Sequence, residues 1–312
     1  MDHFSDEQIM TMCSFDKAIP IMADVLQSPG KYACLRKGIM NFGDGDVLGT
    51  MAAAEKDGPF GVIKSVYLVR QPGQNLPSHQ GQVLLINRNA QGVVACFSAH
   101  TLTALRTAAG SAAATQMLSL ENAEHHLIIG CGFQAYLHAL AVSKIRPIRK
   151  LTLVNRTFSK LERLKEKLQE LNVEIQLLSL EDFQQNPVKA DIISVTTSST
   201  EPVLGVEHVF PGTHINSIGA CTREHQELSP ALIAEAGVFV DNPKVAEYDA
   251  GNILKARDAG FTFDVLQFDY ENPIPLRTSD ITVYNATGAA SQDLALCMYM
   301  YQNAQKLVRN AG

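Results

Sequence analysis

The sequence of 312 residues contains no tryptophan and only six cysteines, which are scattered along the chain. No two cysteines form a Cys-x-x-Cys pair, so their spacing indicates neither a zinc site nor a disulfide framework. Because scattered cysteines without a pairing pattern are typical of a reducing compartment, we expect a cytoplasmic protein. Residues 1–8 are acidic and polar, and this composition does not match that of a signal peptide.

Long apolar runs and basic runs are also missing. No apolar stretch approaches the roughly 18 residues that a membrane-spanning helix needs. The net charge is -6, and no segment is rich in lysine and arginine. We therefore expect neither a membrane nor nucleic acid among the partners. The content of 46% hydrophobic and 19% charged residues is that of a globular protein large enough for two domains.

A short apolar strand followed by glycines is the most informative motif. The apolar residues 127–129 lead into Gly130 and Gly132, and a helical pattern of small residues follows from Ala135. In dinucleotide-binding folds the first glycine permits the tight turn, the second lets the pyrophosphate approach the backbone, and the small third residue lets the helix pack. The helix N-terminus then offers N–H groups to the phosphates. The alternative is an ordinary strand–helix turn.

The second strand of this region, residues 150–154, ends in Asn155, Arg156 and Thr157. Folds that prefer NAD usually place a carboxylate here, on the ribose 2′-hydroxyl. Arginine can instead bind a 2′-phosphate with its planar fork, and threonine can donate its hydroxyl. We therefore expect NADP(H) to be preferred, with NAD(H) possible. The alternative is that Arg156 is a solvated surface residue.

The order of the remaining segments predicts an α/β protein with two domains. Residues 121–288 alternate apolar strands with helical connections, which is typical of a parallel sheet covered on both faces, as in a Rossmann dinucleotide-binding domain. Residues 32–94 alternate short apolar runs with turn residues and predict an antiparallel or mixed sheet. We expect a mixed-sheet α+β domain for substrate binding and dimerisation, residues 1–120, completed by a C-terminal helix in residues 289–312. The strands expected in the Rossmann domain are residues 127–129, 150–154, 173–178, 191–196, 214–218, 238–241 and 282–285.

Three cations stand out in the first domain: Arg36, Lys64 and Arg106. Lys64 interrupts an apolar strand, and Arg106 lies in a helix of small residues. A buried cation is costly without a partner, so the three could together form a clamp for a carboxylate. For each residue alone, a surface side chain with a buried stem is the alternative. His79, in the Pro-Ser-His-Gln segment of residues 77–80, could be a general acid or only a turn histidine.

These motifs occur in one order along the chain, and together they resemble the ornithine cyclodeaminase/mu-crystallin family over nearly its full length. The resemblance implies a dimer, a Rossmann domain beside a mixed-sheet domain, and a substrate carboxylate held at Arg36, Lys64 and Arg106. The ketimine reductase branch is the most similar, through residues 77–80 and 155–157. The segments that carry the resemblance are residues 35–36, 48–51, 64, 77–80, 103–109, 130–135, 155–157, 201–204, 211–220 and 227–228.

One position departs from the cyclodeaminase pattern. In the family, true cyclodeaminases carry an aspartate in the loop after residues 218–219, where it assists chemistry at the amino group. The matching residue here is Cys221, and a neutral thiol is a poor substitute for a carboxylate base. The resemblance therefore favours NAD(P)H-dependent reduction of cyclic imino acids: Δ1-pyrroline-2-carboxylate to proline and Δ1-piperideine-2-carboxylate to pipecolate. A cyclodeaminase, an alanine dehydrogenase-like enzyme and a non-catalytic NADP-dependent binding protein are the alternatives.

The expected site residues fall into three groups, and no metal is expected. The proposed catalytic residues are Lys64, Arg106 and His79, and the proposed substrate-binding residues are Arg36, Lys64 and Arg106. The partners expected are a small cyclic imino acid and a second copy of the chain. The proposed cofactor-binding residues are Thr107, Gly130, Gly132, Phe133, Gln134, Asn155, Arg156, Thr157, Thr196 and Thr287.

Overall fold

The computed structural model describes residues 1–43, 46–69, 79–269, 271, 277 and 280–311, and it divides the chain into two compact units. Unit 1 comprises residues 1–106 and 289–312, and unit 2 comprises residues 107–288. The boundary falls inside helix α3 (Ala99–Leu118), whereas the boundary predicted from the sequence lies just after the same helix. The predicted fold class is confirmed, because unit 1 contains a mixed sheet and unit 2 a parallel one.

Unit 1 is built on a sheet in which sequence neighbours pair as antiparallel hairpins. The order is β1-β7-β6-β5-β4-β2, and β3 also pairs with β4. The first strand makes the sheet mixed, because β1 runs parallel to β7. The strands are β1 (Asp2–Phe4), β2 (Tyr32–Cys34), β3 (Gly38–Asn41), β4 (Val47–Glu55), β5 (Phe60–Leu68), β6 (His79–Asn87) and β7 (Gly92–Ser98).

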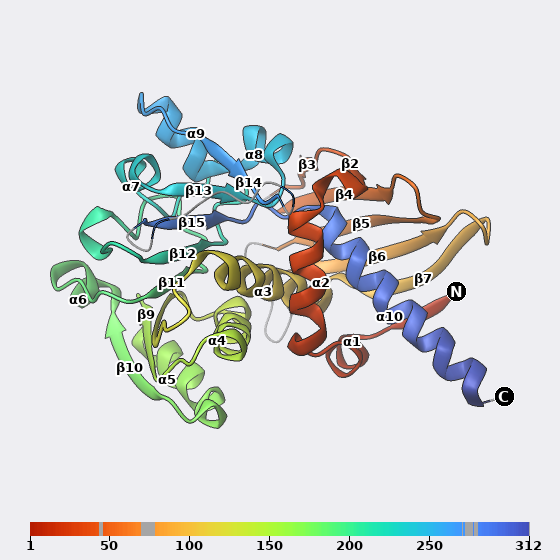
Figure 1. The fold of residues 1–312 in the computed structure, drawn as a ribbon, viewed down its shortest axis with the longest axis horizontal. Coiled ribbons are helices and arrows are strands. Elements are labelled where there is room, and N and C mark those ends of the chain that lie inside the picture. Colours follow the sequence, from red (N-terminus) through yellow and green to blue (C-terminus); the bar gives the residue numbers. More distant parts are fainter. Residues whose placement is uncertain (44–45, 70–78, 270, 272–276, 278–279, 312) are drawn as a thin grey trace. The chain divides into compact units, whose positions relative to one another are not determined.

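Helices cover one face of this sheet. Strand β5 alternates, with Val62 and Lys64 buried and Ile63 and Ser65 exposed, as a strand with one covered face must. The C-terminal helix α10 (Ala290–Ala311) packs on β4, β5 and β6 and beside α2, as Figure 1 shows. The last helix of the chain therefore belongs to unit 1. The other helices of unit 1 are α1 (Asp6–Met12), α2 (Phe15–Gln27) and a 3-10 turn (Pro29–Lys31).

Unit 2 contains an eight-stranded parallel sheet in the order β10-β9-β8-β11-β12-β15-β13-β14. The strand order reverses between β8 and β11, which is the switch point at which doubly wound sheets bind their ligands. All seven predicted strands are present, and only the short edge strand β14 was not predicted. The strands are β8 (His125–Ile129), β9 (Lys150–Asn155), β10 (Glu174–Ser179), β11 (Ile192–Val195), β12 (His214–Ser217), β13 (Gly237–Val240), β14 (Val265–Gln267) and β15 (Thr282–Asn285).

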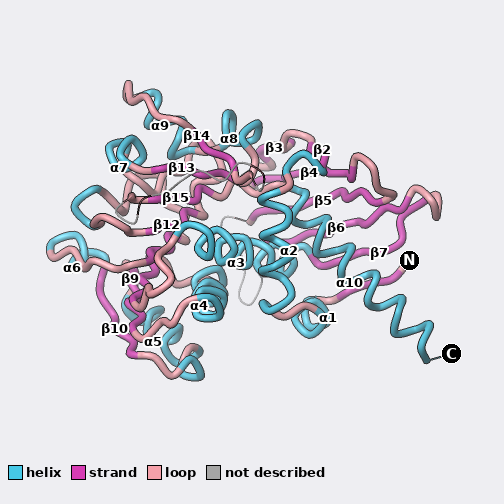
Figure 2. Tube along the Cα trace, viewed as in Figure 1, coloured by secondary structure: helices cyan, strands magenta, loops and turns pink. Residues whose placement is uncertain are grey.

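Helices pack on both faces of this sheet, as Figure 2 shows. Successive residues of β8 enter different cores: Ile128 packs with Ala135 and Leu161, whereas Leu127 and Ile129 belong to the core on the other face. This explains why the strand has no polar alternation. The helices are α4 (Phe133–Ile145), α5 (Phe158–Lys167), α6 (Leu180–Gln185), α7 (Pro230–Glu235), α8 (Pro243–Asp249) and α9 (Gly251–Asp258), with 3-10 turns at Gln169–Leu171 and Val206–His208.

Candidate active site

Lys64 is buried in the middle of strand β5, with only 2% of its surface exposed. Its Nζ donates hydrogen bonds to Thr103 Oγ1 at 2.6 Å and to Asp293 Oδ1 at 3.0 Å. The strand places Lys64 on the face that α10 covers, so α10 supplies the carboxylate. The structure thus rules out the alternative of a surface lysine with a buried stem.

Arg106, on helix α3, reaches the same carboxylate. It is 6% exposed, its Nη1 donates to Gln292 Oε1 at 3.1 Å, and its Nε lies 3.6 Å from Asp293 Oδ1. The two predicted cations are therefore brought together by Gln292 and Asp293, which the sequence analysis did not single out. Their one signal in the sequence is a polar pair, Gln-Asp, at the start of an otherwise small and apolar helical turn.

The charges in this cluster do not cancel. Lys64 and Arg106 contribute two positive charges and Asp293 one negative charge, so one positive charge is in excess. Burial lowers the pKa of Lys64 to about 8; Asp293 opposes this shift, and the Arg106 charge adds to it. Arg106 Nε and Asp293 Oδ2 are buried without a hydrogen-bond partner among the described residues. A buried cluster with surplus positive charge and an unpaired guanidinium N–H suits an anionic ligand.

The third predicted residue of the clamp, Arg36, and the predicted acid, His79, are placed differently. Arg36 lies between β2 and β3 and its side chain is exposed, unlike those of Lys64 and Arg106. Its neighbour Lys37 is half-buried, and its charge contributes to the lowered pKa of Lys64. His79 is the first residue of β6 rather than a turn residue. Its side chain and the preceding residues 77–78 lie outside the described part of the chain.

In unit 2 the predicted glycine turn lies at the carboxyl end of β8. Gly130 has a φ of +114°, and a Cβ at this position would lie 2.7 Å from the backbone oxygen of Thr196. The turn is held by the Gly130 N–H, which donates to Val154 O at 2.9 Å, and by the Thr196 N–H, which donates to Ile129 O at 2.8 Å. Only glycine fits this position, because it needs both the positive φ and the space.

The N-terminus of α4 fits a phosphate group. Gly132 is the N-cap residue; no side chain caps the helix, and a Cβ built on Gly132 would meet nothing within 4 Å. Phe133 is exposed at 39%, and Gln134 Oε1 is a buried atom without a hydrogen-bond partner among the described residues. The N–H groups and dipole of a 13-residue helix without a capping side chain favour an anion here.

The end of strand β9 is also compatible with a dinucleotide. Asn155 Nδ2 donates to Thr157 O at 3.2 Å, which shapes the turn into α5. Arg156 and Thr157 are exposed, and Thr157 is the N-cap residue of α5 but makes no capping hydrogen bond with its side chain. No carboxylate occupies residues 155–157, where a fold specific for NAD usually has one.

A buried glutamate, Glu227, connects strand β12 with the loops after β11 and β12 through hydrogen bonds. The sequence analysis did not identify this residue as part of the site. Glu227 is fully buried, and its carboxylate accepts hydrogen bonds from the Thr197 N–H and hydroxyl, the Ser217 hydroxyl at 2.6 Å and the Gly219 N–H at 2.9 Å. Asn252 accepts from the Glu227 N–H at 2.8 Å and donates to Ser217 Oγ. Burial raises the pKa of Glu227 to about 6, although these hydrogen bonds lower it.

The remaining two predicted cofactor residues are buried: Thr287 follows strand β15, and Thr107 lies on α3. Thr287 is 1% exposed, and both its N–H and its hydroxyl donate to Asp241. The Gly288 N–H donates to the other carboxylate oxygen of Asp241 at 2.7 Å. Thr107 is 7% exposed. Cys221 is half-buried in the loop that follows β12.

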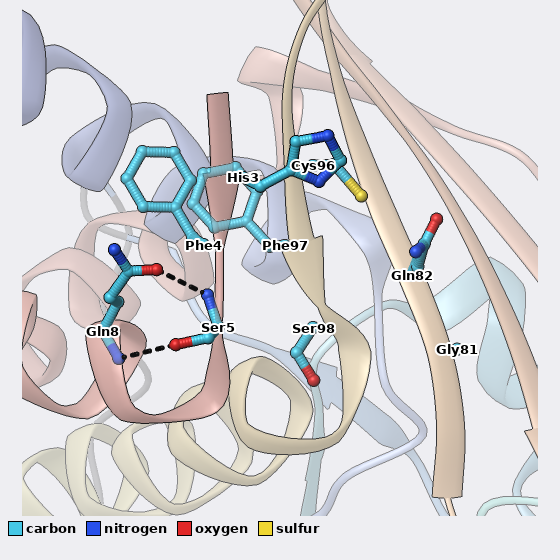
Figure 3. Close-up of a pocket in the computed structure, with 9 residues that line it drawn as sticks. All are labelled: His3, Phe4, Ser5, Gln8, Gly81, Gln82, Cys96, Phe97 and Ser98. Carbon is cyan, nitrogen blue, oxygen red and sulfur yellow. Dashed lines mark hydrogen bonds between the residues drawn. The ribbon is translucent and has the colours of Figure 1, made fainter. Parts of the chain in front are cut away.

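A shallow cavity of about 320 Å³ lies elsewhere in unit 1, beside strands β1, β6 and β7 (Figure 3). Figure 3 shows the two capping hydrogen bonds between Ser5 and Gln8 at its side. The lining residues include none of the predicted site residues. They are His3, Phe4, Ser5, Gln8, Gly81, Gln82, Cys96, Phe97 and Ser98.

The ornithine cyclodeaminase/mu-crystallin family model matches residues 7–307. The chain belongs to this family. It is 30% identical over 228 residues to the ketimine reductase mu-crystallin of Mus musculus, which covers 73% of this chain and 71% of the relative. It is 31% identical over 239 residues to the iminosuccinate reductase of Paracoccus denitrificans, with 74% and 72% covered.

Solved structures of family members share the fold. The Δ1-pyrroline-2-carboxylate reductase of Thermococcus litoralis, in complex with NADH and L-proline, has a TM-score of 0.90 at 22% identity, with 98% of each chain covered. Other relatives are named alanine dehydrogenase and lysine cyclodeaminase, and an archaeal alanine dehydrogenase is described as a dimer with bound NAD. The chain is thus a Rossmann-fold member of a family of NAD(P)-dependent oxidoreductases.

Neither a metal site nor a membrane-spanning helix is found among the described residues. No group of three or more His, Cys, Asp or Glu side chains in these parts of the chain is placed to hold a metal ion. Every described helix is also too short or too polar to cross a membrane.

Proposed function

We propose that the protein reduces cyclic imino acids with NAD(P)H, converting Δ1-pyrroline-2-carboxylate to proline and Δ1-piperideine-2-carboxylate to pipecolate. The observation that carries this proposal is the buried cluster of Lys64, Arg106 and Asp293, whose surplus positive charge suits a substrate carboxylate. The names of two relatives, a ketimine reductase and an iminosuccinate reductase, support reduction of a C=N bond.

In this proposal the protein binds the substrate, orients it and protonates its ring nitrogen. When bound, the reduced nicotinamide supplies a hydride to the imine carbon. Arg106 holds the carboxylate with its guanidinium fork, Lys64 adds a point charge, and Arg36 contributes a further positive charge to carboxylate binding. A protonated ring nitrogen makes the imine carbon more electrophilic. Lys64, whose pKa burial lowers to about 8, or a water near His79 supplies this proton.

We further propose NADP(H) as the preferred cofactor. Gly130, Gly132 and the first turn of α4 would hold the pyrophosphate. Arg156, with Asn155 and Thr157 beside it, would bind the 2′-phosphate, because a charge-assisted contact replaces the usual carboxylate. Thr107, Phe133, Gln134, Thr196 and Thr287 complete the proposed cofactor site.

The competing function is cyclodeamination of ornithine or lysine. Cys221 stands where the family's cyclodeaminases have an aspartate, so we propose that the protein lacks the base for that reaction. The experiment is steady-state oxidation of NADPH with each cyclic imine, in parallel with ammonia release from ornithine. Turnover of an imine supports the reductase, whereas ammonia release without imine turnover contradicts it. Tight imine binding without turnover would indicate a binding protein.

We also propose a homodimer formed through unit 1. The sheet face that α10 does not cover presents Ile63, exposed at 46%, and on the same face β3 exposes Met40 at 60%. A second copy of the chain would bury this apolar surface. Sedimentation at micromolar concentration should give about twice the chain mass of 34.0 kDa, and a monomer would contradict this assignment.

A further inference from the structure

Two neighbouring residues at the start of α10 contact two cations from different elements. Gln292 Oε1 accepts a hydrogen bond from Arg106 Nη1 at 3.1 Å, and Asp293 Oδ1 accepts one from Lys64 Nζ at 3.0 Å. Gln292 is 1% exposed and Asp293 is fully buried. Because successive helix residues project about 100° apart, one turn of α10 presents acceptors to both cations.

Asp293 is unsuited to binding the substrate itself. Its negative charge would repel a substrate carboxylate, yet it sits between the two groups best suited to bind one. Removing one partner of a buried ion pair leaves the other charge uncompensated and free to move or to lose its proton. The place of Asp293 therefore indicates a role exerted through Lys64, to which it is hydrogen-bonded.

We propose that Asp293 is a positioning residue of the carboxylate site: it holds the Lys64 ammonium in place, while Gln292 accepts the hydrogen bond from Arg106. This inference rests on the proposed function only in that Lys64 and Arg106 bind the carboxylate of the ligand. The inference assigns the C-terminal helix α10 a functional role in the site, although 229 residues separate Asp293 from Lys64 in the sequence.

The electrostatic surroundings of Lys64 support this role. Burial lowers the pKa of Lys64 to about 8, and the charges of Arg106 and Lys37 lower it as well, whereas Asp293 raises it. Cys297, one turn further along α10, also faces this group; its pKa is raised well above the ordinary value by burial, so it contributes no charge near neutral pH. Without the Asp293 charge, the pKa of Lys64 must fall below about 8, so Lys64 would lose its proton at a lower pH than in the wild type.

The test is the pH dependence of carboxylate binding by Asp293→Asn, a nearly isosteric variant without the charge. The probes are L-proline, L-pipecolate and L-alanine, titrated calorimetrically with saturating NADPH from pH 6 to pH 9.5. In the wild type, affinity for the best of the three should fall above about pH 8. In Asp293→Asn this fall should begin at least about one pH unit lower, with affinity largely recovered at pH 6.

Asp6→Asn is the matched control. It removes another carboxylate of unit 1, which accepts a hydrogen bond from the Thr101 N–H at 3.2 Å but is not among the charges that act on Lys64. The control should keep the wild-type pH profile. An Asp293→Asn protein that is folded by circular dichroism and shows the wild-type profile, or the same loss at every pH, overturns the inference.

A second pair of variants covers the case in which Asp293→Asn does not fold. Lys64→Met and the double variant Lys64→Met/Asp293→Asn should bind the probe within about twofold of each other, because Asp293 would act through a residue that is no longer there. Additive losses contradict the inference, as does a wild type that binds none of the three carboxylates. A wild type that binds L-proline with the expected pH profile but reduces no cyclic imine overturns the proposed function and supports the role of Asp293.

Discussion

Lys64 Nζ lies 3.0 Å from Asp293 Oδ1, and both side chains are almost fully buried. The pair joins the central strand of the mixed sheet to the last helix of the chain, and Arg106 comes within 3.6 Å of the same oxygen. Buried ion pairs of this kind add little net stability compared with apolar residues of similar size. The buried charges of Lys64 and Asp293 in the middle of the sheet are therefore better explained by a role in ligand binding than by a role in stability.

The first prediction concerns Arg106. Lysine at this position would keep the charge but could not reproduce a bidentate contact with a carboxylate. Arg106→Lys should lower kcat/KM for imine reduction roughly ten- to a hundredfold, corresponding to about 1.4–3 kcal/mol of transition-state stabilisation. Steady-state kinetics with NADPH would measure this loss. Full activity of the variant would show that Arg106 does not bind the substrate carboxylate with a bidentate contact.

Periodicity and turn residues predicted the longer elements of the fold because these elements obey local rules. The glycine turn at Gly130 and Gly132 and the capping box of Ser5 and Gln8 are set by neighbours in the sequence. The edge strand β14 escaped prediction because three half-buried residues give no periodic signal.

The sequence singled out some members of the buried cluster in the candidate site and missed others. Lys64 and Arg106 were found because cations among apolar residues need an explanation. Asp293 was missed because its partner is 229 residues away, and helical spacing gives no information on such a contact. Glu227 was quoted only as part of the family resemblance, and its four donor groups come from three different loops or strands that only the folded sheet brings together.

The second prediction concerns the cofactor. Arg156→Ala should raise the KM for NADPH roughly ten- to a hundredfold relative to the KM for NADH, because a hydrogen bond to a charged group contributes about 1.5–3 kcal/mol. Arg163→Ala removes another exposed arginine of the same region and serves as the control. Equal losses with both cofactors would show that Arg156 does not bind the 2′-phosphate.

The third prediction concerns His138, which is fully buried on α4. Its Nδ1 donates to Gln134 O at 2.7 Å, and its Nε2 contacts Ser111 Oγ at 2.9 Å. Burial lowers the pKa of His138 to about 4. The unfolded chain, with an ordinary histidine pKa of 6.5, therefore binds the proton first as the pH falls. Stability should decrease between about pH 6.5 and pH 4, at most about 1.4 kcal/mol per pH unit from this residue.

Chemical unfolding at pH 7 and pH 5 would measure this effect. Replacing His138 with glutamine should remove about 2 kcal/mol of the difference in unfolding free energy between the two pH values, whatever the variant's absolute stability. His214, whose pKa burial lowers to about 3, contributes with the same sign and stays in both proteins. Exposed His3→Gln is the control. A pH dependence of stability identical to that of the wild type would contradict the prediction.

The last prediction concerns Cys221, which lies half-buried in the loop after β12. If the thiol only fills the space that an aspartate occupies in cyclodeaminases, its removal should change the rate of imine reduction little. Cys221→Ala should then reduce the cyclic imines within a few-fold of the wild-type kcat/KM, a difference of under about 1 kcal/mol. Imine reduction and ornithine-dependent ammonia release are measured on both proteins. A variant that is folded yet inactive on the imines would assign the thiol a direct role, and efficient ornithine turnover by the wild type would show that this loop supports deamination without a carboxylate.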